Sequence, residues 1–84
     1  MSQSADSIDE LRAHIDSVDD EIAAALQRRR ALVAALREEK AQRGVAFVDP
    51  AREAVIEARY RRVLSALSSE QLHTLVRAVL ESSR

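Results

Sequence analysis

The residues of this sequence that could do chemistry are charged side chains placed where the apolar pattern calls for hydrophobes. From Ile8 onward, apolar residues recur at alternating spacings of three and four, and the same count lands on Arg29. A guanidinium buried in an apolar helix interface costs free energy unless an anion pairs with it. The planar guanidinium can donate two parallel hydrogen bonds to a carboxylate. The pattern therefore predicts that Arg29 meets either a buried acidic side chain or the carboxylate of a ligand.

Other charged residues lie where they could join Arg29. Lys40 is eleven residues further on, about three helical turns, and shares its face. Arg12 lies at the edge of the same stripe, and Arg52 and Glu53 open a later helix. Periodicity alone also allows Arg12, Lys40 and Arg52 to be solvated side chains. The remaining arginines of the helices are expected to be solvated: Arg28, Arg30, Arg37, Arg59, Arg61 and Arg62.

The sequence lacks the patterns of several common kinds of catalytic site. It shows no nucleophile–base pair, no Gly-rich phosphate loop and no carboxylate dyad at a useful spacing. There is no cysteine, and His14 and His73 lie far apart without metal-ligand spacing, so no metal is expected. An enzyme built from these residues would hold an anionic substrate and stabilise developing charge.

A long helix must carry most of these charges. The stretch from about 8 to 42 contains no Gly and no Pro, and Ser7 with Glu10 has the spacing of a capping box. Gly44 is a typical stop signal. The predicted helix would be about 50 Å long, more than a chain of 84 residues can cover alone. The apolar stripe of this helix consists of Ile8, Leu11, Ile15, Val18, Ile22, Ala25, Leu32 and Leu36.

Two shorter helices follow a loop over residues 43–49. Asp49 and Pro50 predict the start of a helix over about 50–66, and Ser68 with Gln71 predicts another over about 69–82. The prediction is a single all-α domain, 1–84, with three helices. Because the two short helices can cover only one side of the long one, we expect a homodimer with paired long helices.

The charge and hydropathy of the sequence bear on its binding partners and its location in the cell. The net charge of −1 provides no field that would attract nucleic acid, and no apolar run approaches membrane-spanning length. The polar, acidic start resembles neither a signal peptide nor a transit peptide. We therefore expect a cytoplasmic protein that binds neither nucleic acid nor membrane.

Several motifs in this order resemble the all-helical class (type II) of chorismate mutases, in a short single-domain form. The match runs from about Ile8 to Ser83. Each motif is weak alone, but their order and mutual spacing are specific. The motifs are Leu11-Arg12-x-x-Ile15-Asp16-x-x-Asp19, Leu26-x-x-Arg29-x-x-Leu32, Lys40, and Gly44-x-x-x-Val48-Asp49-Pro50-x-Arg52-Glu53.

The resemblance implies an intertwined dimer that rearranges chorismate to prephenate, toward phenylalanine and tyrosine, without a cofactor. It implies that Arg29 and the partner chain's Arg12 hold the substrate carboxylates, and that Lys40 donates to the ether oxygen. It further implies that Arg52 and Ser83 contact a carboxylate. Glu53, with the backbone around Asp49, would bind the ring hydroxyl, and Ile56 and Leu80 would pack against the ring.

One departure from the family pattern concerns the end of the third helix. Well-studied members carry a glutamine or glutamate about one turn after the position of Ser83, which shares the ether oxygen with the lysine. This sequence ends at Arg84 and does not show that residue. Losing one such donor typically costs about 10²–10³ in rate. The resemblance then suggests a weak catalyst that a larger shikimate-pathway synthase activates by docking.

Three alternatives remain open at the level of the sequence. Isochorismate pyruvate lyases and aminodeoxychorismate mutases use the same scaffold, and Glu53 favours a hydroxylated ring only mildly. A non-catalytic helical dimerisation module would explain the heptads and capping boxes, but would leave Arg29, Lys40 and Arg52 without a reason for their spacing.

Overall fold

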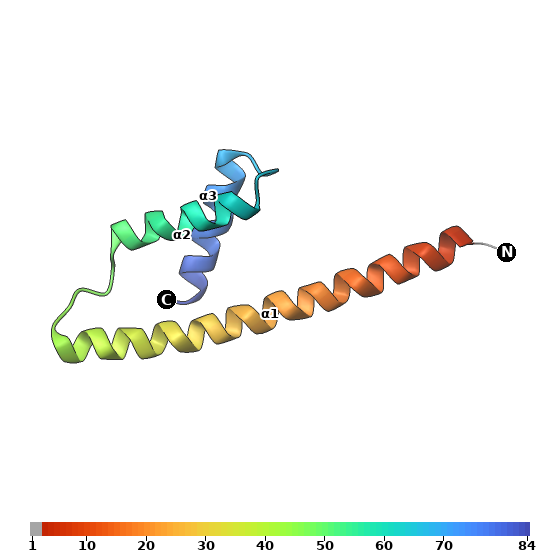
Figure 1. The fold of residues 1–84 in the computed structure, drawn as a ribbon. Coiled ribbons are helices and arrows are strands. Elements are labelled where there is room, and N and C mark those ends of the chain that lie inside the picture. Colours follow the sequence, from red (N-terminus) through yellow and green to blue (C-terminus); the bar gives the residue numbers. More distant parts are fainter. Residues whose placement is uncertain (1–2) are drawn as a thin grey trace.

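The protein is described by a computed structural model covering residues 3–84, with side chains from residue 7 onward. Its three helices are α1 (Gln3–Arg43), α2 (Pro50–Val63) and α3 (Ser69–Ser82), and this part of the chain contains no strand (Figure 1). The predicted all-α fold of one long and two shorter helices is confirmed. Over residues 3–84, none of the helices combines the length and apolar character needed to cross a membrane.

The long helix α1 begins earlier than its sequence pattern predicted. It starts at Gln3, so Ser7 lies inside the helix, and the predicted start at Ile8 with Ser7 as its cap is wrong. Residues 3–6 contain no Gly or Pro to stop the helix from extending over them. At the other end, Gly44 has φ 68°, and the N–H groups of Val45 and Gly44 donate to the carbonyls of Lys40 (2.9 Å) and Ala41 (3.3 Å). This Schellman motif ends α1 where predicted.

Side-chain caps set the starts of the two short helices. Oδ1 of Asp49 accepts from the N–H of Arg52 at 3.2 Å, and Pro50 takes the first helical position. Ser68 and Gln71 form the predicted capping box, with reciprocal bonds of 3.1 and 2.9 Å. The bounds of α3 are those predicted, whereas α2 ends at Val63, three residues before its predicted end.

The hydrophobic core is small and centres on α3. Leu72 and Val76 are each only 1% exposed, Leu80 is nearly as buried, and Ile56 and Tyr60 of α2 pack against them. In contrast, the apolar stripe on the first half of α1 is uncovered, with Ile15 57% exposed. Figure 1 shows this half of α1 extending beyond α2 and α3. The chain measures 66 × 26 × 16 Å, so its elongation comes from a helix half that the chain itself does not cover.

Candidate active site

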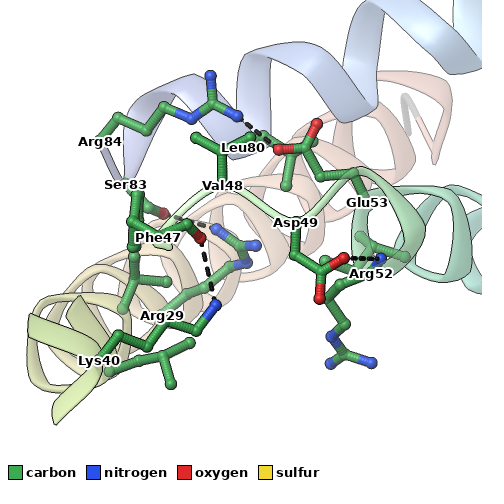
Figure 2. A pocket seen from close by; sticks show the side chains of 13 residues that line it. Arg29, Lys40, Phe47, Val48, Asp49, Arg52, Glu53, Leu80, Ser83 and Arg84 are labelled. Atoms are coloured by element: carbon green, nitrogen blue, oxygen red, sulfur yellow. Dashed lines mark hydrogen bonds and ion pairs between the residues drawn. The ribbon is translucent and has the colours of Figure 1, made fainter. Parts of the chain in front are cut away.

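A cavity of about 90 Å³ lies between the second half of α1, the loop before α2, the first turns of α2 and the end of α3. Figure 2 shows the side chains that line it. The structure brings eight of the nine predicted site residues to this one place: Arg29, Lys40, Asp49, Arg52, Glu53, Ile56, Leu80 and Ser83. The residues came from separate stretches of the sequence, so their convergence is a property of the fold.

Arg29 lies half-buried in the cavity wall. Its Nη1 donates to Oγ of Ser83 at 2.7 Å, and Ser83 is only 8% exposed. None of the ion pairs among residues 7–84 includes Arg29. Its position in the stripe predicted either a buried acidic side chain or a ligand carboxylate as its partner. No such acidic side chain is found in this part of the chain. The guanidinium charge is available to an anionic ligand.

Lys40 is held by the loop that follows α1. Its Nζ donates to the carbonyl oxygen of Phe47 at 3.2 Å, and no carboxylate of residues 7–84 lies within ion-pair distance of it. The Phe47 ring lines the cavity, and the guanidinium of Arg37 lies over that ring at 4.3 Å. Arg37 is exposed as predicted, but its contact with Phe47 was not predicted. The loop carbonyl thus fixes the direction of the ammonium group.

The two carboxylates of the cavity have different surroundings. Asp49 uses Oδ1 to cap α2, whereas Glu53 is paired through both of its oxygens. Nη1 of Arg77 donates to Oε1 of Glu53 at 2.8 Å, and Nη2 of Arg84 donates to Oε2 at 2.6 Å. The hydrogen bond to Glu53 is also the main reason that the pKa of Arg77 is raised above its ordinary value. Glu53 is therefore held in place by cations.

The charge of the lining favours a small dianion. Four cationic side chains, Arg29, Lys40, Arg52 and Arg84, face two carboxylates, which leaves a net charge of +2. Apolar side chains supply the rest of the wall. Such a site can bind the two carboxylates of a ligand and stabilise negative charge that develops elsewhere on that ligand. The apolar side chains that line the cavity are Val33, Leu36, Phe47, Val48, Ile56 and Leu80.

Some lining residues escaped the sequence reasoning. Arg84 and Val33 were not predicted. Val33 lies four residues after Arg29 in α1 and therefore on the same helical face, whereas Arg84 lies beyond the end of α3. Phe47, for which no role was predicted, also lies in the cavity wall.

Arg12 is the predicted site residue that the structure does not bring to the cavity. It is on α1, seventeen residues before Arg29, which corresponds to about 25 Å along the helix. Its helix half is the exposed one. Within a single chain, Arg12 therefore lies far from the cavity.

Comparison with known proteins places the chain in a family. No match to the chain was found among curated proteins or among solved structures. The family model described as "Chorismate mutase type II" matches residues 11–84. That range contains every predicted site residue, Arg12 included, and all of α2 and α3. With its three helices and its cationic cavity, the chain belongs to the chorismate mutase type II family.

Proposed function

We propose that the chain is a chorismate mutase that catalyses the rearrangement of chorismate to prephenate, on the route to phenylalanine and tyrosine. The observation that carries the proposal is the pair Arg29 and Lys40, which face one cavity with no carboxylate partner among residues 7–84. Family membership supports this activity in general terms. The cavity also lacks a nucleophile–base pair, and the proposed reaction needs none.

The reaction is an intramolecular exchange of bonds. A C–O bond of the ether breaks while a C–C bond forms within the same molecule, so no proton and no outside group has to be transferred. The ether oxygen gains negative charge as its bond lengthens. Lys40 is proposed to donate to this oxygen, where a positive charge acts more strongly on the transition state than on the ground state.

The bonding of Lys40 leaves capacity for that role. An ammonium group has three N–H donors, and only one is used by the carbonyl of Phe47. The remaining donors can reach a ligand while the loop keeps the side chain in position. The cost of ordering this side chain is thus met before the substrate arrives.

The two substrate carboxylates are assigned to the arginines. Arg29 holds one carboxylate together with Ser83, whose hydroxyl accepts from Arg29 and so keeps its own proton to donate to the ligand. Arg52 adds a further contact at the start of α2. Glu53, with the backbone around Asp49, accepts the ring hydroxyl, and Ile56 and Leu80 pack against the ring.

The second carboxylate is assigned to Arg12 of another copy of the chain, in a homodimer. Two observations support this: the apolar stripe around Arg12 is exposed, and Arg12 is too far along α1 to reach its own cavity. The cavity of one chain, about 90 Å³, is also small for a ligand site, which fits a wall completed by a partner helix.

The test is a chorismate-disappearance assay on the purified chain, with product analysis. Prephenate as the product supports the proposal. Release of pyruvate from isochorismate, or faster turnover of aminodeoxychorismate, would assign the same cavity to a different reaction. Absence of turnover, together with no thermal stabilisation by chorismate, would instead favour a non-catalytic dimerisation module.

A further inference from the structure

Four charged side chains form a closed ring beside the cavity. Arg77 donates to Glu53 at 2.8 Å and to Glu81 at 3.0 Å, and Arg84 donates to the same two carboxylates at 2.6 and 3.1 Å. Each arginine thus bridges both glutamates, and the ring ties the first turn of α2 to the end of α3. Figure 2 shows Arg84 reaching Glu53 at the cavity edge.

The two arginines approach Glu53 from different sides. Arg84 lines the cavity described above, whereas Arg77 lines a second cavity of about 150 Å³, in which Glu57 and His73 also lie. Glu53 lines both cavities. Arg77 can therefore act on Glu53 without contacting a ligand in the first cavity.

The pairing changes what Glu53 offers to a ligand. Each carboxylate oxygen accepts more than one hydrogen bond, so Glu53 can still accept from a ligand donor although both oxygens are occupied. Its negative charge, however, is compensated by guanidinium groups at close range, and the ring of two arginines and two glutamates has no net charge. The hydrogen bond to Glu53 raises the pKa of Arg77 above its ordinary value, so this guanidinium stays charged.

Such a carboxylate discriminates between kinds of donor. A neutral hydroxyl gains a hydrogen bond and needs no charge compensation. An ammonium in the same place would normally gain from an uncompensated carboxylate, but here it also meets the positive field of Arg84 and Arg77. The same pocket without the arginines would favour the ammonium.

We propose that Arg77 and Arg84 are specificity-determining residues, which compensate the charge of Glu53 so that the pocket selects a ring hydroxyl over a ring ammonium. This inference rests on the proposed function, in which Glu53 receives the ring substituent. It assigns to Arg77, a residue outside the ligand cavity, an effect on the choice of substrate.

The test compares chorismate with aminodeoxychorismate below neutral pH, where the ring amine is protonated. The quantity measured is the ratio of kcat/KM for the two substrates in the wild type, in Arg77→Gln and in Arg84→Gln. We expect each variant to shift the ratio toward the amino substrate by about three- to fivefold, the range expected for one partly exposed charge contact. Arg77→Lys and Arg84→Lys, which keep the charge, should restore most of the wild-type ratio.

Two further variants keep the test decisive. Glu81→Gln leaves both arginines to Glu53 alone, so it should shift the ratio in the opposite direction, toward chorismate, and it answers the question even if a glutamine variant of either arginine does not fold. Arg61→Gln is the matched control: Arg61 is an exposed arginine of α2 that lies 4.0 Å from Glu57 and lines neither cavity. It should leave the ratio unchanged.

The outcomes separate this inference from the proposed function. An unchanged ratio in a folded Arg77→Gln variant, or a shift in Arg84→Gln alone, would overturn the role of the arginine pair while chorismate turnover still stood. An equal loss of kcat/KM with both substrates would show that the ring of charged side chains only holds α2 and α3 together, which would overturn the inference. If the wild type neither converts nor binds either compound by calorimetry, the proposed function and this inference both fail.

Discussion

The two halves of α1 carry one apolar repeat, interrupted at Arg29, but have different surroundings. In the second half, the stripe residues Leu32 (71% exposed) and Leu36 (48% exposed) are also open, but Leu26 and Val33 beside them are partly covered. There Arg29 and Lys40 make contacts with the end of α3 and with the loop. In the first half, Ile8 to Ile22 remain about half exposed or more, and nothing in the described chain packs on them. The repeat states which face of the helix requires a partner. It does not state whether that partner is the same chain or another one.

The difference suggests a division of roles along one helix. The second half positions cations inside a cavity of its own chain, and the first half offers an apolar surface together with Arg12. On the proposed function, a single long helix thus serves two sites, one in each chain of a dimer. Variants placed in one half or the other can separate these roles.

The largest effect is expected from Lys40→Ala, which changes the second half alone. We expect kcat to fall by about 10²–10³, because the donor to the ether oxygen is lost. Helical content by circular dichroism and the sedimentation coefficient should stay at wild-type values. Near-full turnover in this variant would remove Lys40 from its assigned role.

Ile15→Glu tests the first half. A charge in the middle of the exposed stripe should prevent association, since a buried unpaired carboxylate is costly. Sedimentation should then report monomers, and activity should fall about as far as on loss of Arg12, by roughly 10². Val63→Glu is the control, because Val63 is 81% exposed at the end of α2. Dimers of Ile15→Glu with full activity would contradict the proposed interface.

Mixing two inactive variants tests whether Arg12 crosses between chains. Arg12→Ala and Lys40→Ala should each be nearly inactive. In a heterodimer of the two, one site receives an intact Arg12 from one chain and an intact Lys40 from the other. Random exchange of subunits should therefore restore about a quarter of wild-type activity. No recovery, with exchange verified by native mass spectrometry, would show that Arg12 of one chain does not complete the site that contains Lys40 of the other.

The smallest effect is expected from Arg37→Ala, within the second half but outside the cavity lining. Arg37 lies over the ring of Phe47, whose carbonyl holds Lys40. Losing this cation–π contact should loosen the loop and lower kcat by about threefold, in line with its modest energy at an exposed site. Arg30→Ala on the same helix is the control. A wild-type kcat in Arg37→Ala would show that the loop keeps its place without this contact.

Much of the fold could be predicted because its signals are local. Asp49 with Pro50, and Ser68 with Gln71, satisfy backbone donors within one turn, and both caps are present where predicted. The capping-box spacing of Ser7 and Glu10 led to a wrong prediction, because the helix already includes the residues from Gln3 onward. A capping pattern marks a helix start only where the preceding residues leave the helical conformation.

The candidate site was predictable only in part. Arg29 and Lys40 stood out as charges on an apolar face, and the resemblance to a family linked them to residues of the loop and of α3. Arg84 carried no such signal, and its bond to Glu53 spans 31 positions of the chain. Contacts of that separation depend on how α3 returns to α2, which no local pattern records.

By itself, the sequence determined the three helices, the caps at the starts of α2 and α3, and the charged residues that break the apolar repeat. These features depend on bonds and side-chain spacings within a few residues. Only the tertiary structure decided that Arg29 donates to Ser83, that the loop carbonyl of Phe47 holds Lys40, and that two arginines compensate Glu53. The contact of Lys40 spans only seven residues but depends on the path of the loop after α1. The other pairings join segments far apart in the chain, which meet because α3 packs against α2 and α1.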